Sequence, residues 1–361
     1  MFWMQNDPQV RKHPLPRQVS LRRGTIDDEY ATFEVMRRTM GHEMAWSHHA
    51  QARYHLQNTA CSSFWLAEEK QRFTSPRVVG YARSVVREGV WCLTEFFVLP
   101  GHHRQGIGGA LLACCMEEGD AFGVDTRLVL ASQHPAADSL YVRKLGCYPR
   151  LPMVMLVGSL SRLHPPTGEA PKIVETTLPF VDPVMSRQAA QTVGEILRAE
   201  PLILTPEVTE AIDALDRRIV GYARPQEHAF WAREMGGMEG AGRLFRRARR
   251  SADGADELGE ITGYAYLGSH SSGPALAETP DDLPHMLAHV AALSRALANA
   301  GSEFDLVQPL EQYWALAGSN EITLRWLLDC GWQIIFHYLF MSTRPLGSLD
   351  RYVGYNPLYF L

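Results

Sequence analysis

Short stretches rich in apolar residues recur along the first half of the chain, and one of them, residues 19–22, alternates apolar and polar positions; such stretches predict β-strands. The stretches are residues 19–22, 63–67, 78–85, 91–99, 128–130 and 153–157. Phe33, Met36 and Met40 recur instead at helical spacing, so a helix is expected between the first two strands. The pattern predicts a mixed α/β domain, in which a central and mostly antiparallel sheet is flanked by helices.

The same order of elements restarts after a segment rich in proline and glycine at residues 164–171. The repeated features are a strand at 173–176, the aromatic pairs at 64–65 and 230–231, and the Gly-Tyr-Ala tripeptides at 80–82 and 263–265. Gly80 lies 66 residues before Gly146, and Gly263 lies 68 residues before Gly331. This near-equal spacing indicates a duplication, although a third Gly-Tyr-Ala at 221–223 lacks the flanking order.

The predicted organisation is therefore two tandem domains of the same kind. We expect an N-terminal arm over residues 1–18, a first domain over 19–163, a linker over 164–171 and a second domain over 172–361.

A glycine-rich loop follows the strand that ends near Val98. Gly106, Gly108 and Gly109 leave backbone N–H groups unshielded by Cβ atoms, and the loop leads into a predicted helix whose N-terminus favours an anion. No Lys-Ser/Thr pair follows, and the spacing is not Gly-x-Gly-x-x-Gly, so the two commoner phosphate loops are excluded. The segment is expected to hold phosphates, the alternative being an ordinary strand-to-helix turn.

This loop resembles the acyl-CoA pyrophosphate loop of the GNAT superfamily of N-acyltransferases, whose pattern is Arg/Gln-x-x-Gly-x-Gly/Ala after a strand ending in Val-x-Pro. In this chain the first position falls on His103, and the arginine comes one residue later. A second motif of the family, Ala-x-x-Leu-Tyr-x-x-x-Gly-Phe, is matched from Ala137 to Gly146, with one extra residue after Tyr141. The resemblance implies that acetyl-CoA is bound by Phe97, Val98, Leu99, His103, Arg104, Gln105, Gly106, Ile107, Gly108, Gly109 and Ala137.

Tyr141 is the candidate general acid. The resemblance places it near the CoA sulfur, and a phenol with an ordinary pKa near 10 can protonate a thiolate. The alternative is a helix tyrosine that packs on the sheet.

Glu95 is the candidate general base, because it interrupts an apolar strand three residues before Val98. An amine must lose a proton before it attacks, and a carboxylate can take that proton directly or through water. Alternation places Glu95 on the face opposite Phe96 and Val98, so a position at the edge or the surface is the competing interpretation.

The second half lacks these features. Residues 276–283, at the position of the phosphate loop, hold no glycine and three carboxylates, which would repel a pyrophosphate. Leu327 stands where the tyrosine belongs. We therefore expect a second domain that keeps the fold without binding CoA and serves to close the substrate cleft or to form a homodimer.

Composition limits the remaining classes of function. A formal net charge of −5 argues against nucleic-acid binding, and the arginines at 243–250 are followed at once by carboxylates, which favours a solvated hairpin over a phosphate patch. The six cysteines have no CxxC spacing and are expected to be free thiols, and no metal site is predicted. Neither a signal pattern nor a long apolar run is present, so we expect a cytoplasmic protein without membrane contact.

The sequence thus predicts an acetyl-CoA-dependent N-acetyltransferase that transfers acetyl directly to a primary amine of a small molecule or peptide, without a covalent acyl-enzyme. The alternative is a non-catalytic acyl-CoA sensor, which would need the loop but neither Tyr141 nor Glu95. A purely structural pair of domains is disfavoured, because only the first loop keeps its glycines.

Overall fold

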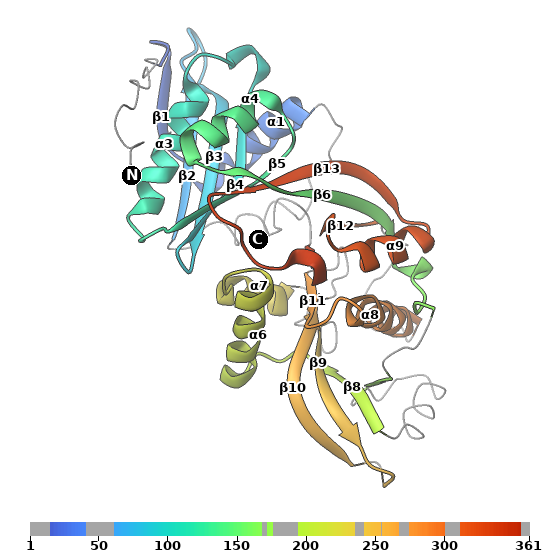
Figure 1. Ribbon diagram of the computed structural model, residues 1–361. Coiled ribbons are helices and arrows are strands. Elements are labelled where there is room, and N and C mark those ends of the chain that lie inside the picture. Colours follow the sequence, from blue (N-terminus) through green and yellow to red (C-terminus); the bar gives the residue numbers. More distant parts are fainter. Residues whose placement is uncertain are drawn as a thin grey trace, which may run out of the picture. The chain divides into compact units, whose positions relative to one another are not determined.

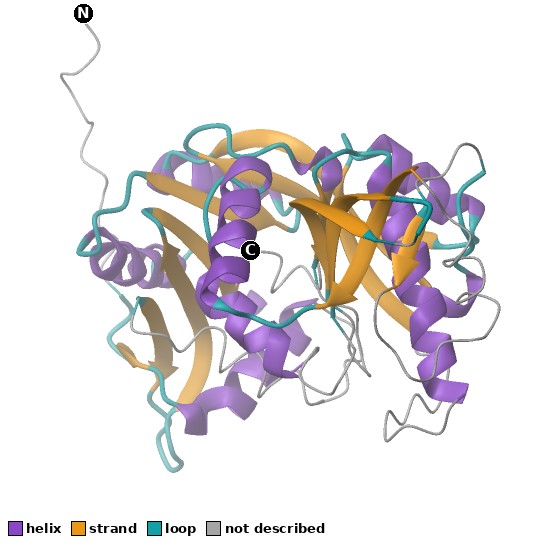
Figure 2. Cartoon of the chain, turned by 90° about the horizontal axis from the view of Figure 1, so that it is seen from below, coloured by secondary structure: helices purple, strands orange, loops and turns teal. Residues whose placement is uncertain are grey.

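The computed structural model describes residues 15–40, 61–167, 172–175, 194–234, 242–253, 255–266, 274–299 and 311–354. Most of the expected N-terminal arm and the end of the expected linker lie outside these residues. Contacts divide the chain into two compact units, residues 1–127 and 128–361, and each is described by itself. The described residues mix helices and strands (Figure 2), which confirms the predicted α/β class.

The first unit is built on four antiparallel strands in the order β1-β2-β3-β4. Its strands are β1 (Val19–Arg23), β2 (Ser62–Glu69), β3 (Arg77–Arg87) and β4 (Val90–Val98); its helices are the short η1 (Ile26–Asp28), α1 (Glu29–Met40), the short η2 (Pro100–His102) and α3 (Ile107–Asp120). Strand β5 (Thr126–Ala131) begins where this unit ends. All of these strands, and the helix after the glycine-rich loop, were predicted from the sequence.

The two faces of this sheet carry different helices. On one face α3 packs so closely that a Cβ at Gly119 would meet the Trp91 ring, whose Nε1 donates to Cys115 O at 3.2 Å. On the other face Arg83 reaches Glu29 at the start of α1. A β-bulge at Thr94 separates the stretch of β4 that holds Trp91 from the stretch that holds the site. Because a bulge shifts the alternation by one residue, it sets which side chains point to which helix.

The second unit contains all the remaining elements. They are α4 (Pro135–Leu140), η3 (Tyr141–Leu145), β6 (Tyr148–Ser159), η4 (Leu160–Arg162), β7 (Ile173–Glu175), β8 (Gly194–Pro201), α6 (Pro206–Ile219), α7 (Pro225–Glu234), β9 (Arg243–Arg250), β10 (Asp256–Ala265), β11 (Ala275–Ala277), α8 (Asp282–Asn299), β12 (Glu311–Ala317), α9 (Glu321–Asp329), β13 (Gln333–Ser342), η5 (Leu349–Arg351) and β14 (Tyr352–Gly354). Its strand order is β5-β13-β6-β12-β14-β11-β10-β9-β8-β7, and among these described strands β7 and β8 alone pair in parallel.

Strand β13 departs from the expected arrangement. Residues 153–157, the last strand predicted for the first half, lie on β6, but β13 of the second half lies between β5 and β6 and pairs antiparallel with both. Figure 1 shows the long β13 and β6 side by side, although about 180 residues separate them in the sequence. On its other edge β6 pairs with β12. The two halves therefore exchange strands, and neither half completes its sheet with its own residues.

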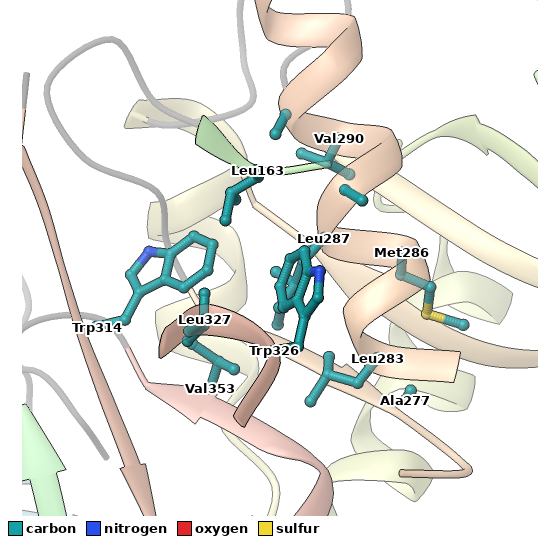
Figure 3. Packing of buried hydrophobic residues seen from close by; sticks show 14 of the residues in the cluster. Leu163, Ala277, Leu283, Met286, Leu287, Val290, Trp314, Trp326, Leu327 and Val353 are labelled. Carbon is teal, nitrogen blue, oxygen red and sulfur yellow. The ribbon is translucent and has the colours of Figure 1, made fainter. Parts of the chain in front are cut away.

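The core of the second unit lies where α8 and α9 pack on the strands. Leu283, Met286, Leu287 and Val290 recur at helical spacing along α8 and are buried. Figure 3 shows them together with Trp326 and other apolar residues of this core. The sequence prediction of a helix at the late Gly331 is confirmed by α9, where Leu327 is fully buried.

Of the two sequence correspondences between the halves, the structure supports the one between the Gly-Tyr-Ala tripeptides and not the one between the aromatic pairs. Residues 80–82 lie on β3 and 263–265 on β10, whereas 221–223 form the turn between α6 and α7, so the choice of the 263 copy is correct. The pair Phe230-Trp231 lies in helix α7, and its match with the β2 pair at 64–65 is wrong, because aromatic pairs pack equally well from a helix or a strand.

The arginine-rich segment forms the β9–β10 hairpin that the sequence predicted. Three of its arginines pair with carboxylates near the surface: Arg246 with Glu200, Arg247 with Asp282, and Arg250 with Asp256. Arg243 is buried and pairs with Glu175.

Candidate functional site

The loop between β4 and α3 has a backbone shaped to expose N–H groups. After η2, Arg104 and Gly106 take positive φ angles of 62° and 81°, and Gly106 is the N-cap residue of α3. Residues in left-handed conformation that alternate with right-handed ones turn successive N–H groups toward one concave side. Such a concavity is a site for an anion.

The first turn of α3 adds further donors. The first intrahelical bond runs from Ala110 N to Gly106 O at 3.0 Å, so the N–H groups of Ile107, Gly108 and Gly109 have no intrahelical acceptor. Gly106 has no side chain to cap them, and the first turn contains no acidic residue. These amides and the positive end of the helix dipole can bind phosphate oxygens.

The three glycines of the loop have different roles. Gly106 provides the positive φ that starts the helix. A Cβ at Gly108 would lie 2.9 Å from the Phe96 ring and 3.8 Å from Val98, so this glycine lets α3 sit close to β4. A Cβ at Gly109 would meet nothing within 4 Å, which leaves its backbone open to a ligand.

Two side chains brace the loop. The Nε2 of His103 lies 2.8 Å from Val98 O, and Gln105 Nε2 donates to Gly101 O at 3.1 Å. His103, at the first position of the family pattern, thus supports the loop through the strand end. His102 Nε2 lies 3.3 Å from Glu69, and no metal-ligating cluster occurs among the residues that the structure describes.

The end of β4 presents one backbone donor away from its partner strand. Leu99 N donates to Val79 O at 2.9 Å, so this amide is already used in pairing with β3. Because alternate residues of an antiparallel pair direct their N–H groups to opposite sides, the N–H of Val98 points away from β3. Phe97 lies on the α1 face, where its ring packs on Tyr81 at 5.6 Å between centroids.

Glu95 lies inside the first unit and not on its surface. It is 2% exposed and pairs in register with Arg83 on β3, directly after the bulge at Thr94. Arg83 Nε lies 3.5 Å from Glu95 Oε2, and its Nη2 donates to Glu29 at 2.6 Å. The surface interpretation of Glu95 is therefore wrong, because its carboxylate belongs to a buried cluster that also holds Glu29 and Arg83.

Tyr141 and Ala137 belong to the second unit. Helix α4 contains Ala137 and continues into a π-helical turn from Tyr141 to Leu145, and Gly146 N bonds back to Tyr141 O. A π turn holds one residue more than an α turn, so it takes up the extra residue that the sequence places after Tyr141. The insertion leaves the register of α4 up to Tyr141 unchanged.

Burial favours the protonated phenol of Tyr141. The side chain is 6% exposed, and burial raises its pKa above the ordinary value, with a further increase from Asp138. The group is therefore protonated at neutral pH, as a proton donor must be.

The corresponding position in the second half is closed to anions. Asp282 begins α8, and its Oδ2 accepts hydrogen bonds from Thr279 and Arg247, each at 2.6 Å. A carboxylate thus already occupies the N-terminus where the first half has open amides. The predicted loss of the phosphate loop agrees with this geometry.

A buried polar network in the second half was missed by sequence reasoning. Asp216 of α6 accepts two hydrogen bonds from Arg224 and one from Tyr264, and contacts His228 at 2.9 Å. Arg224 also donates to Tyr352 of β14 at 2.8 Å. All five side chains are fully buried. The available signal was Asp216 on the apolar face of α6, beside Ile212 and Ile219.

A comparison with protein-family models matches the segment that contains the glycine-rich loop. Residues 29–147 match the model of the acetyltransferase (GNAT) family, so this segment of the chain is similar to that family. The matched segment includes α1, the strands β2, β3 and β4, the loop and Tyr141. No curated protein matches the chain significantly.

Solved structures match over almost the whole chain. A proposed acetyltransferase of Pyrococcus horikoshii has 14% identity and a TM-score of 0.60, with 96% of this chain and 98% of that chain covered. A GCN5-related N-acetyltransferase of Sphaerobacter thermophilus has 12% identity, a TM-score of 0.56, and coverage of 94% and 100%. A tandem GNAT protein of the clavulanic acid biosynthesis pathway has 15% identity, a TM-score of 0.50, and coverage of 91% and 99%. The chain therefore has a tandem GNAT fold.

No helix among the described residues is both long and apolar enough to cross a membrane.

Proposed function

We propose that this protein is a cytoplasmic, acetyl-CoA-dependent N-acetyltransferase that acts on a primary amine by direct transfer. The main support is the loop geometry in the family-matched segment: open amides at the start of α3, next to a strand end whose Val98 N–H points away from its partner strand.

In this reaction the amides of Gly106 to Gly109 would hold the pyrophosphate, and Val98 N–H would polarise the thioester carbonyl. Glu95 would take a proton from the ammonium, so that the free amine attacks the carbonyl carbon and forms a C–N bond. When the C–S bond breaks, Tyr141 would protonate the thiolate. Direct transfer needs no covalent acyl-enzyme, and the proposal includes none.

The binding step is tested by calorimetric titration with acetyl-CoA. We expect one site per chain, because the other candidate helix N-terminus carries Asp282. Gly109→Glu should abolish binding by charge repulsion, while the matched control Gly109→Gln should bind with only a modest loss. A glutamate at this position favours helix formation, so weaker binding would not reflect an unfolded helix. Two sites per chain, or equal affinity of both variants, would contradict the loop assignment.

The catalytic step is tested by release of free CoA thiol in the presence of acetyl-CoA and a panel of amines: spermidine, kanamycin, free lysine and a lysine-containing peptide. Turnover with one of them, lost in Glu95→Gln, supports an enzyme. A chain that binds acetyl-CoA tightly and acetylates none of them would favour the alternative, a non-catalytic acyl-CoA sensor. Sedimentation velocity of the same preparation measures whether the chain forms the expected homodimer.

A further inference from the structure

Arg83 is a buried arginine shared unequally between two carboxylates. Its Nη2 donates to Glu29 Oε1 at 2.6 Å, whereas its Nε lies 3.5 Å from Glu95 Oε2. The side chains of Arg83 and Glu95 are 2% and 0% exposed. Two carboxylates and one guanidinium therefore lie together in the interior of the first unit.

The short contact with Glu29 holds the Nη2 end of the Arg83 guanidinium. Glu29 is the first residue of α1, where the helix dipole stabilises a carboxylate. The guanidinium carbon also lies 3.7 Å from the centre of the Phe64 ring, a cation–π distance. A planar guanidinium can hold two partners at once in this way, which a lysine ammonium reproduces only in part.

We propose that Arg83 is a positioning residue for acetyl transfer: anchored by Glu29 and Phe64, it orients the carboxylate of Glu95 toward the acceptor amine. This inference rests on the proposed function. The Arg83–Glu95 contact is long, and this matters for the proposed role. A tight ion pair would stabilise the carboxylate of Glu95 too strongly for it to accept a proton from the amine. Glu29 keeps the guanidinium from closing on Glu95.

The test is the pH profile of kcat with the amine that gives the fastest thiol release. Among the residues that the structure describes, the titratable groups placed against Arg83 are Glu29 from α1, Glu95 from β4 and Tyr81 from its own strand. Arg83→Met removes the cation, so kcat should fall at least about tenfold and the acidic limb should move to higher pH by about one unit. Glu29→Gln releases Arg83 toward Glu95, so the acidic limb should move to lower pH.

Opposite shifts of the two variants are the expected result, since loss of packing alone would not move the profile in two directions. Arg83→Lys should restore part of kcat and return the acidic limb toward that of the wild type. The matched control is Arg22→Met, which breaks another arginine shared between two carboxylates, Asp28 and Glu68, each at 2.7 Å, and should leave the profile unchanged.

Two failures are distinguishable. If Glu95→Gln abolishes turnover while Arg83→Met and Glu29→Gln keep the wild-type profile, the positioning role is refuted and the proposed function stands. If the wild-type protein acetylates no amine, the proposed function fails and the role of Arg83 falls with it. Should Arg83→Met not fold, the profiles of Glu29→Gln and Arg83→Lys decide the matter.

Discussion

Replacement of Arg224 by methionine should destabilise the second unit strongly. Arg224 is fully buried and makes four hydrogen bonds, two to Asp216 and one each to the hydroxyls of Tyr264 and Tyr352. The variant keeps most of the volume but leaves Asp216 buried without its main counter-charge. Removal of one partner of a buried ion pair costs about 3–5 kcal/mol.

We expect the loss in the free energy of unfolding for Arg224→Met to lie within this range and not above it. Asp216 retains the hydrogen bond from Tyr264 at 2.7 Å and the contact with His228 at 2.9 Å, so its charge is still partly compensated. A change of this size should lower the melting temperature by about 10 °C. It should leave acetyl-CoA affinity nearly unchanged, because the glycine-rich loop belongs to the first unit.

Urea unfolding of the full-length chain, followed by fluorescence, measures the free energy of unfolding. The matched control is Arg218→Met on the neighbouring helix α6: Arg218 is more than half exposed and pairs with Glu278 at 3.1 Å, so its loss should cost at most about 1 kcal/mol. If both variants changed the free energy of unfolding by the same small amount, the charge of Asp216 would have to be compensated in another way, and the reasoning would fail.

The other predictions concern single groups. Tyr141→Phe should lower kcat by about a hundredfold or more with little change in acetyl-CoA affinity, since a proton donor acts in the transition state; full activity would exclude the role. Burial alone would raise the pKa of Asp216, but Arg224 and His228 outweigh it and hold that pKa well below its usual value. This stability is present above about pH 4 and is lost as the pH falls further, which acid titration of urea midpoints measures. Gly108→Ala should lower the melting temperature through its contact with Phe96, whereas Gly109→Ala should raise it slightly; the reverse order would contradict the packing.

The sequence was sufficient to predict those elements that are specified by residues close together in the chain. The strand, loop and helix from Val90 to Asp120 follow each other without interruption, and glycine and apolar positions specify each of them. The lost loop of the second half was equally visible, because Asp282 and its neighbours are carboxylates. In both cases the physical cause lies within a few residues of the effect.

The environment of Glu95 could be predicted only in part from the residues next to it in the sequence. Alternation placed it correctly opposite Phe96, but the bulge at Thr94 and the partner Arg83 arise from pairing with another strand. Burial of a charged residue depends on that partner, and a partner on another strand leaves no trace in the alternation of the strand itself. The π turn after Tyr141 is similar, since one extra residue can be a loop insertion or a helical bulge with the same sequence.

The exchange of β13 was beyond prediction for a related reason. The apolar residues of β13 would suit a central strand in the sheet of either half of the chain. Which strands it pairs with depends on the tertiary structure and not on its own sequence. The limits of the two domains proposed from the sequence therefore remain predictions about sequence segments, while the strands of the two halves interleave.

The interleaving of β13 has a consequence for synthesis on the ribosome. The edge of β5 that receives β13 is made about 200 residues before β13 itself. At a translation rate of roughly 5–20 residues per second, the nascent chain carries this open edge for about 10–40 s. Open strand edges recruit other chains, so this interval is when the polypeptide is most prone to aggregate. A faster translation rate over the intervening codons, or a chaperone that covers the edge, should raise the yield of folded protein.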